Sequence, residues 1–395
     1  MSYNFDAAVS PFIKALPASG LAKFLDIMAS NPNIVPLSVG EPDFDIPQAV
    51  KDAEIVSISE GKSCYTPTLG LLELREAIAD DTYKNYGVKY DPKTEIMVTV
   101  GVSEALYTTI TTIMHPGDEI ILPEPCYVAN KACVILAGGK PVSVETFQEN
   151  GFVPTIEDLE KAVTPKTKAI MLGYPNNPTG AGMTWEDKQK IARFAIKHDL
   201  IVFSDEIYED LSYVPRSPSI ATIPGMHDRT VVFNGFSKAF AMTGFRIAYA
   251  VGPHDLIDAM MKIHQYTMLC APGPCQIGAR EALTNGAEER EAMRVEYEER
   301  RNVIVKGFND MGLPCFMPRG AFYVFPCIKS TGMTSMEFSK ALLEEERVAA
   351  VPGSAFGTSG EGYIRCSYAT SMAEILEALK RIREFLVENN IYHGN

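Results

Sequence analysis

One lysine in this sequence lies where an amine nucleophile could form. Lys238 follows the apolar run Val231–Phe233 and is flanked by Ser237, small residues and aromatic residues rather than by other charges. Apolar surroundings disfavour an ammonium ion, so they lower the pKa of a lysine and release a nucleophilic amine. Arg246 follows eight residues later, and a guanidinium can hold a phosphate through two hydrogen bonds. The segment therefore combines an amine for covalent chemistry with an anchor for a phosphate.

Other polar and aromatic groups follow predicted strands, at the edge where open α/β sheets bind ligands. The stretch Gly101–Glu104 forms a glycine turn that opens a helix, and the free backbone N–H groups of Ser103 and Glu104 suit a phosphate. Tyr127 follows the doubly proline-stiffened loop Pro123–Pro125. Its ring could therefore stack on a flat heteroaromatic ligand.

Two motifs in the middle of the chain supply partners for such a ring. Asn177 lies in the proline-restricted loop Tyr174–Gly180, and its amide could hydrogen-bond a phenolic oxygen. Asp205 ends an apolar strand, where a carboxylate needs a partner, and Tyr208 lies three residues further on. A protonated pyridine nitrogen is such a partner and turns the ring into an electron sink. Together with the amine and the phosphate anchor, these groups predict a pyridoxal phosphate site.

Each of these residues also has a simpler interpretation. A lone lysine near a strand end is usually a solvated surface residue. The turn before Ser103 could be an ordinary strand-to-helix connection, Tyr127 a packed core aromatic, and Asp205 the N-cap of a helix. The prediction of a cofactor site therefore depends on the coincidence of several such groups at the ends of different strands.

The order of the elements predicts an α/β fold with two domains. From about residue 46 to 280, apolar runs alternate with helical stretches, which favours a large cofactor-binding domain with a mostly parallel seven-stranded sheet between helices. Residues 281–395 have an α+β pattern, and we expect them to form a smaller domain together with the N-terminal arm, residues 1–45. The arm contains a helical patch at Leu21–Met28 and a strand-like run from Val35 to Asp43.

The expected strands of the large sheet are Glu95–Val100, Glu119–Leu122, Lys140–Val144, Lys168–Leu172, Leu200–Ser204, Thr230–Asn234 and Ile247–Val251. The expected helices include Glu104–Met114, Glu186–His198, Glu288–Met311, Ser335–Glu346 and Met372–Glu388, with small-domain strands at Gly320–Phe325 and Tyr363–Ser367.

Composition excludes several classes of protein. The 395 residues carry a net charge of −14, which argues against nucleic-acid binding because that function needs a basic surface. Eight scattered cysteines without zinc spacing suit free thiols in a reducing cytoplasm, and they predict no metal site. The N-terminus lacks a secretory signal, and no apolar run is long enough to span a bilayer. A cytoplasmic protein without membrane partners is therefore expected.

The motifs together resemble those of a known family. Gly235–Lys238, continued by Gly244–Ala248, matches position by position the lysine-attachment signature of class I aminotransferases, which have the aspartate aminotransferase fold, or fold type I. Asn177–Gly180 and Ser204–Tyr208 precede this signature in the expected order and spacing. The resemblance covers essentially the whole chain. Many relatives have a serine where this chain has Gly235, and Ser237 is expected to take over that phosphate contact.

The resemblance implies a role for each residue around the cofactor. Lys238 would form the Schiff base and then act as general base, with Asp205 and Tyr208 as the other catalytic residues. Asp205 would pair with the pyridinium nitrogen, Asn177 and Tyr208 would bind the phenolic oxygen, and Tyr127 would stack on the ring. The phosphate would be held by Ser103, Glu104, Ser237 and Arg246.

The resemblance also implies a substrate site and an assembly. Arg365 would clamp the substrate α-carboxylate, helped by the backbone of Gly40 and by Tyr127 and Asn177. Tyr65 matches a tyrosine that reaches the phosphate of the neighbouring subunit's cofactor, so a homodimer is expected.

The activity implied is a ping-pong transfer of an amino group from an L-amino acid to a 2-oxo acid, usually 2-oxoglutarate. The donor stays open between aspartate, aromatic and diaminopimelate-type amino acids. Ser103 stands where the aspartate-specific branch often has a lysine, which counts against aspartate. A C–S β-lyase of the cystathionine type is the alternative, since it shares the fold and the cofactor residues. Ligand-sensing transcription regulators also share the fold, but they carry an added DNA-binding domain, and only a short arm precedes Gly40 here.

Overall fold

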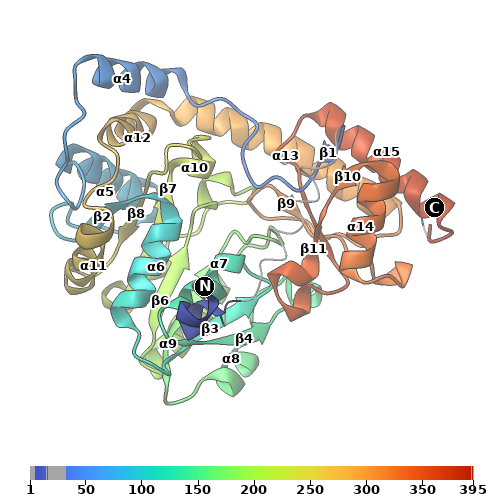
Figure 1. Cartoon of the computed structure of the whole chain (residues 1–395), viewed down its shortest axis with the longest axis horizontal. Coiled ribbons are helices and arrows are strands. Elements are labelled where there is room, and N and C mark those ends of the chain that lie inside the picture. The colour runs from blue at the N-terminus through green and yellow to red at the C-terminus, as the bar shows by residue number, and fades with distance from the viewer. Residues whose placement is uncertain (1–4, 15, 17–32, 393, 395) are drawn as a thin grey trace.

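A seven-stranded sheet forms the centre of the protein in a computed structural model that describes residues 5–14, 16, 33–392 and 394 (Figure 1). The strand order is β2-β8-β7-β6-β5-β3-β4, and β8 alone runs antiparallel to both of its neighbours. The predicted α/β fold with a mostly parallel sheet is therefore confirmed. The strands of this sheet are β2 Ile96–Thr99, β3 Glu119–Glu124, β4 Lys140–Glu145, β5 Thr167–Gly173, β6 Ile201–Asp205, β7 Thr230–Gly235 and β8 Ala248–Val251. No predicted boundary of these strands differs from the observed one by more than two residues.

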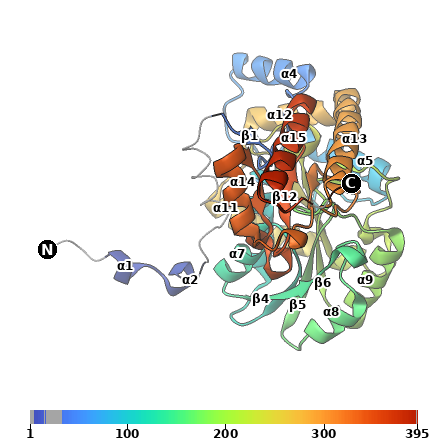
Figure 2. The same cartoon turned by 90° about the vertical axis from the view of Figure 1, so that its right-hand side faces the viewer.

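Helices cover both faces of the sheet (Figures 1 and 2). Successive residues of a strand point to opposite faces. Ile120 and Phe203 accordingly pack with α6, α7 and α11 on one face, while Ile121 and Val202 pack with α8 and α9 on the other. Helices α5 and α12 extend this second cover over β2 and β8. Because helices cover both faces, the inner strands are mainly apolar rather than alternating. The edge strand β4 is the exception, since Lys140, Ser143 and Glu145 are exposed.

The helices described along the chain are α1 Phe5–Ala8, α2 Pro11–Lys14, α4 Gln48–Ser59, α5 Leu72–Tyr86, α6 Gly101–Ile113, α7 Val128–Leu136, α8 Ile156–Ala162, α9 Trp185–Lys197, α10 Phe236–Ala239, α11 His254–Thr267, α12 Gly273–Asn285, α13 Ala287–Asp310, α14 Ser335–Glu346 and α15 Met372–Glu388. The predicted ranges of α14 and α15 are confirmed, whereas α6 begins three residues before its predicted start. The helix predicted at Leu21–Met28 lies outside the described residues.

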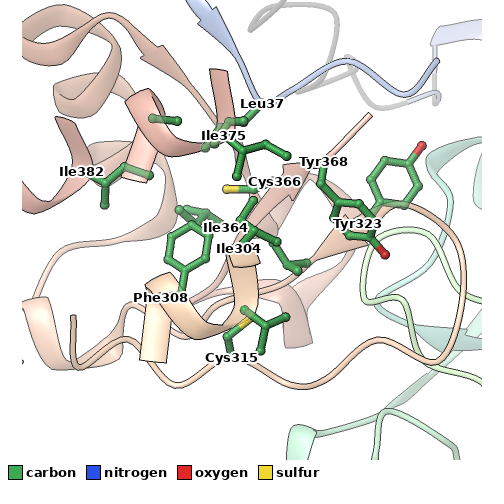
Figure 3. Close-up of a cluster of buried hydrophobic side chains, with 14 of the residues drawn as sticks. Leu37, Ile304, Phe308, Cys315, Tyr323, Ile364, Cys366, Tyr368, Ile375 and Ile382 are labelled. Carbon is green, nitrogen blue, oxygen red and sulfur yellow. The ribbon is translucent and has the colours of Figure 1, made fainter. Parts of the chain in front are cut away.

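A second core lies among α13, α14, α15 and the shorter strands (Figure 3). Strand β9 (Tyr323–Val324) pairs with β12 (Ile364–Ser367), which pairs in turn with β11 (Val351–Pro352). The two regular β9 residues are fewer than the strand predicted at Gly320–Phe325. The strand-like run from Val35 is likewise regular only over β1 (Val35–Pro36), which pairs with β10 (Val348–Ala349).

The pairing of β1 with β10 brings the two ends of the chain together. Leu37, just beyond β1, packs into the same core as Ile375 and Ile382 of α15 (Figure 3). The segment after β1, from Ser38 to Glu41, therefore lies against the end of the sheet where the candidate site forms.

Three further findings concern the whole described part of the chain. No helix there is long and apolar enough to cross a membrane. No group of three or more His, Cys, Asp or Glu side chains in the described ranges could hold a metal ion. The eight cysteines are free thiols.

Candidate active site

A cavity of about 410 Å³ opens beyond the ends of the central strands β5, β6 and β7. Its lining draws on distant parts of the chain, from the segment after β1 to β12. Ten of the twelve predicted site residues lie in its walls: Gly40, Ser103, Tyr127, Asn177, Asp205, Tyr208, Ser237, Lys238, Arg246 and Arg365. The coincidence of strand-end groups on which the prediction depended is thus real in three dimensions.

Lys238 lies on the short helix α10, which begins directly after β7. Its Nζ atom donates a hydrogen bond of 2.6 Å to the carbonyl oxygen of Gly40. Burial, together with the charges of Arg365 and Arg246, lowers the pKa of Lys238 to about 8, although the carboxylates of Glu41 and Asp205 oppose this shift. The amine is therefore much closer to neutrality at physiological pH than a surface lysine, as an amine nucleophile needs.

Asp205 is the last residue of β6, and its carboxylate lines the cavity. Its Oδ1 atom accepts a hydrogen bond of 3.2 Å from the backbone N–H of Ile207. Burial raises the pKa of Asp205 to about 7, and the adjacent Glu206 carboxylate adds to this rise. No helix begins at this residue, so the simpler interpretation of Asp205 as a helix N-cap is wrong. A cationic group in the cavity would stabilise the ionised carboxylate.

Arg365, on β12, has its guanidinium held in one plane. It contacts the rings of Tyr323 and Phe356, with its Cζ atom 4.6 Å and 4.9 Å from the two ring centres. Nη1 donates to the Oδ1 atom of Asn177 over 3.0 Å, and Nη2 donates to the carbonyl oxygen of Ser38 over 2.7 Å. Each of these nitrogens carries a second N–H, so a fixed two-pronged donor remains for a carboxylate.

The loop that carries Asn177 is braced by its neighbour Asn176. The Oδ1 atom of Asn176 accepts hydrogen bonds from the backbone N–H and the hydroxyl of Thr179, and its Nδ2 atom donates to the carbonyl oxygen of Gly173. The two asparagines therefore have different roles in the loop. Asn176 holds the turn and Asn177 lies at the cavity beside Arg365.

A cation lies over the start of α6 at another corner of the cavity. Gly101 opens this helix with φ of 76°, and a Cβ atom there would overlap the guanidinium of Arg246. Ser103 and Ser237 line the cavity at the same corner. A guanidinium, two hydroxyls and the N-terminus of a helix together suit a phosphate.

Two tyrosines meet on the opposite wall. The hydroxyl oxygens of Tyr208 and Tyr323 lie 2.9 Å apart in a hydrogen bond. The Nζ atom of Lys238 lies 5.9 Å from the centre of the Tyr208 ring. Tyr127 precedes α7 and also faces the cavity. Flat apolar faces and phenolic hydroxyls are thus available around the amine.

Two predicted residues lie outside this cavity. Tyr65 is 83 % exposed. The side chain of Glu104 is buried, where it accepts a hydrogen bond from the backbone N–H of Val100 and pairs with His264. Glu104 can therefore serve a phosphate only through its backbone, as predicted.

Several cavity residues were not predicted as site residues: Ser38, Val39, Glu41, Val102, Cys126, Asn130, Gly173, Pro175, Asn176, Ile207, Thr243 and Tyr323. Ser38 and Glu41 lie within a motif already noted in the sequence. Tyr323 carries no local signal, because it lies in an apolar run that reads as an ordinary strand.

A sheet-end cavity that joins a lysine amine of lowered pKa, a strand-end aspartate and an arginine guanidinium is typical of an enzyme of the aspartate aminotransferase fold. Comparisons with known proteins agree with this class. Residues 32–382 match the family model described as aminotransferase class I and II, and the chain belongs to this family. The resemblance noted in the sequence is confirmed, and the protein is an aminotransferase that acts on amino acids and 2-oxo acids.

Similar proteins match over almost the full length. The chain is 50% identical to "Putative aminotransferase YugH" of Bacillus subtilis over 96% of its own length and 98% of that protein. It is 44% identical to an aspartate aminotransferase of Pyrococcus abyssi, with 97% and 100% covered. Among solved structures, an aromatic aminotransferase from Pyrococcus horikoshii superposes with a TM-score of 0.90 at 44% identity, with 94% of this chain and 100% of that chain covered.

Enzymes of this family and fold use pyridoxal phosphate, and the cavity fits this cofactor. Because Gly101 has no Cβ atom, the Arg246 guanidinium can lie over the start of α6, beside the Ser103 and Ser237 side chains that suit a phosphate. Asp205 offers a carboxylate in the cavity wall to a ring nitrogen, and Lys238 offers an amine of lowered pKa to an aldehyde. The cavity thus offers a partner for the phosphate, the ring nitrogen and the aldehyde of the cofactor.

Proposed function

We propose that the protein transfers the amino group of an L-amino acid to 2-oxoglutarate, by a ping-pong mechanism in which each substrate binds the same cavity in turn. One observation carries this proposal. A lysine whose pKa is lowered to about 8 shares a 410 Å³ cavity with the Asp205 carboxylate and the Arg365 guanidinium. Pyridoxal phosphate, when bound, supplies a carbonyl for the amino group and a ring that withdraws electrons from the substrate α-carbon.

Lys238 moves the proton in the proposed mechanism. Its amine is first the nucleophile that holds the cofactor. Once a substrate amine replaces it in the first half-reaction, the freed amine would take the proton from the α-carbon of the amino donor. In the second half-reaction it would give a proton to the α-carbon derived from the 2-oxo acid. Its lowered pKa supports this role, because a base with a pKa near the working pH exchanges protons readily in both directions.

Asp205, Asn177 and Tyr208 tune the ring. Asp205 holds a proton on the ring nitrogen, which keeps the ring electron-poor. Asn177 has its amide oxygen committed to Arg365, so its NH₂ group is left to donate to the phenolic oxygen. Tyr208 donates to the same oxygen, and Tyr127 stacks on the ring face.

The cofactor's phosphate is held at the start of α6. Arg246 provides the charge, the hydroxyls of Ser103 and Ser237 donate hydrogen bonds, and the backbone N–H groups of Ser103 and Glu104 complete the set. Gly101 supports this assignment because its lack of a side chain lets Arg246 lie over the helix N-terminus.

Arg365 binds the substrate α-carboxylate through the two N–H groups that its bonds to Asn177 and Ser38 leave free. Gly40 lies alongside, where its backbone already contacts Lys238. The carboxylate is common to all amino-acid and 2-oxo-acid substrates, so this clamp serves both half-reactions. The identity of the amino donor stays open between aspartate, aromatic and diaminopimelate-type amino acids.

A homodimer completes the proposed site, with Tyr65 reaching the phosphate in the neighbouring subunit. The exposure of Tyr65 on its own chain supports this, as do the exposed apolar residues Ile55, Val56 and Ile58 on α4. Coexpressing a Tyr65→Ala chain with a Lys238→Ala chain tests it. Each mixed dimer has one intact site, so activity should return above that of either variant alone. Failure to complement in a purified mixed dimer would contradict the shared site.

Residues 46–280 are proposed as the large cofactor-binding domain, and residues 281–395 with the arm 1–45 as the small one. The packing of Val35 and Leu37 among residues of α13, α14 and α15 supports the assignment of the arm. The cytoplasm is the proposed location, and the eight free thiols are consistent with a reducing compartment.

One experiment tests the activity and its rival together. Purified holoenzyme is incubated with 2-oxoglutarate and a panel of amino donors, and separately with cystathionine. Glutamate formation with at least one donor supports the transferase, whereas pyruvate and thiol released from cystathionine alone would point to the β-lyase. A Lys238→Ala protein should lose about 10³-fold or more in turnover. Full activity in that variant would refute the mechanism.

A further inference from the structure

Tyr323 touches three parts of the cavity at once. It is 1 % exposed and lies on β9. Its hydroxyl is 2.9 Å from the hydroxyl of Tyr208, and its ring centre is 4.6 Å from Cζ of Arg365. The same hydroxyl would be 2.8 Å from a Cβ atom built on Gly40. Tyr323 therefore contacts Tyr208 and Arg365, and it lies against the backbone of Gly40, which accepts the hydrogen bond of Lys238.

The direction of the bond between the two phenols follows from proton counting. Each phenol has one proton. If Tyr208 gives its proton to the phenolic oxygen of the cofactor, its own oxygen must accept the proton of Tyr323. The result is a chain of two donors in one direction, and such chains strengthen the terminal hydrogen bond by polarisation.

We propose that Tyr323 is a positioning residue with two separable functions: its hydroxyl orients the proton of Tyr208 towards the cofactor, and its ring holds the plane of the Arg365 guanidinium. This inference rests on the roles proposed above for Tyr208 and Arg365. The ring function resembles that of Phe356, which also contacts the guanidinium, but Phe356 has no hydroxyl to contribute.

Few charges compete with this assignment around Tyr208. Arg365 and Asp205 act on its hydroxyl, and the ammonium of Lys238 lies 5.9 Å from its ring centre. Burial raises the pKa of Tyr208 well above its usual value, and the Tyr323 hydroxyl contributes to that rise. Both phenols therefore stay protonated throughout the neutral range, and neither titrates in the experiments below.

The hydroxyl function is tested by the pH titration of the cofactor's visible absorbance band in the holoenzyme. A hydrogen bond to the phenolic oxygen favours its anion, so a weaker bond raises the pH at which the band changes. Tyr323→Phe should shift that midpoint upward by about half a pH unit, and Tyr208→Phe should shift it further in the same direction. Tyr213→Phe is the matched control: Tyr213 is a phenol with hydrogen-bond partners in the core around β9, outside the cavity. The titration midpoint of Tyr213→Phe should match that of the wild type.

The double variant Tyr208→Phe with Tyr323→Phe decides whether Tyr323 acts through Tyr208. If it does, the double variant has the midpoint of Tyr208→Phe alone. An additional shift, or an unshifted Tyr323→Phe protein beside a normal wild-type band, overturns the inference. Absence of any visible band in the wild type would instead refute the proposed function.

The ring function is separated by a second substitution. Tyr323→Phe keeps the ring against Arg365, so the KM for amino donors should change little. Tyr323→Leu removes the ring and should raise that KM about tenfold for every donor. Equal KM values for the two variants would overturn this half of the proposal.

Gly40 offers a test of the geometry that is independent of the spectrum. Gly40→Ala places a Cβ against the Tyr323 hydroxyl, whereas the next ring atom, Cζ, is 3.8 Å away. The substitution should therefore impair donor binding in the wild type. The same change should do less harm in the Tyr323→Phe background, where the hydroxyl is gone. Equal losses of kcat/KM in both backgrounds would show that the hydroxyl is not where the inference requires it.

Discussion

The Nη1 atom of Arg365 donates a hydrogen bond of 3.0 Å to the Oδ1 atom of Asn177, 188 residues away in the sequence. Arginine has donors and no acceptor, so this bond determines which end of the Asn177 amide faces the guanidinium. The NH₂ group must then face elsewhere. One contact thus links the proposed binding site for the substrate carboxylate to the groups proposed to bind the phenolic oxygen of the cofactor.

Asn177→Asp should disturb both sides of this link. The new carboxylate pairs with Arg365 and competes with the substrate carboxylate, so the KM for all donors should rise about tenfold or more. Asn177→Ala is the comparison, because it removes the amide without adding charge. Steady-state kinetics with two unlike donors measures the difference. Equal KM values for the Asp and Ala variants would contradict the competition.

Capture of the cofactor by the cofactor-free protein should depend on pH. Only the neutral amine attacks an aldehyde, and the pKa of Lys238 is lowered to about 8. Below that pH the amine is mostly protonated, so the rate of band formation should rise with pH and reach half its maximum near pH 8. Glu41→Gln should move the midpoint to lower pH, since the Glu41 carboxylate favours the ammonium form. A rate independent of pH between 6 and 9 would contradict this prediction.

Gly101→Ala should weaken cofactor binding beyond its effect on stability. The residue has a positive φ of 76°, and its Cβ would displace the Arg246 guanidinium. Gly138→Ala is a matched control, with a φ of 79° and no atom within 4 Å of its Cβ. Both variants should lose about 1 kcal/mol of folding stability through backbone strain. Only Gly101→Ala should raise the Kd for pyridoxal phosphate, measured by titration of the cofactor-free protein.

Glu54→Gln should stabilise the protein at alkaline pH. Glu54 lies on α4 and packs against α12. Its Oε1 atom has no hydrogen-bond partner, and burial raises its pKa to about 7. With a raised pKa, the folded state binds more protons than the unfolded state between pH 4.5 and 7. Stability is therefore lost as pH rises through this window.

The neutral amide of Glu54→Gln removes that loss. At pH 8 the free energy of unfolding of this variant should therefore exceed that of the wild type by about 2 kcal/mol, measured by thermal unfolding. At pH 4 the gain should vanish, because the carboxyl is then protonated in both states. Glu76→Gln, an exposed change on the neighbouring helix α5, should stay within about 0.5 kcal/mol of the wild type at both values. A gain that persists at pH 4 would contradict the electrostatic explanation.

Much of the fold was predictable because its signals are local. Most of the seven strands are short apolar runs bounded by turns, and sheets buried on both faces require such runs. Helices α14 and α15 begin at capping boxes, Thr334 with Glu337 and Ser371 with Glu374, which specify a start residue by residue. The antiparallel direction of β8 was not predicted, because a buried strand has the same composition in either direction.

The parts that were missed depend on contacts between distant segments. The two-residue strands β1, β10 and β11 are too short for any periodicity and exist through their pairing alone. Tyr323 and Asn130 lie in apolar or mixed stretches, and only packing brings them to the cavity. The simpler interpretation of Asp205 failed for a different reason. A helix cap is a local expectation, but the short 3-10 helix that follows begins only at Glu209, after Tyr208.

The bond from Arg365 to the carbonyl oxygen of Ser38 spans 327 residues and has a consequence for synthesis on the ribosome. The sheet and the proposed cofactor anchors Ser103, Lys238 and Arg246 all lie before residue 252, so they leave the exit tunnel first. The proposed donor-binding corner joins Ser38 to Arg365 and cannot form until β12 has emerged. A nascent chain therefore has its cofactor anchors before it can recognise an amino acid.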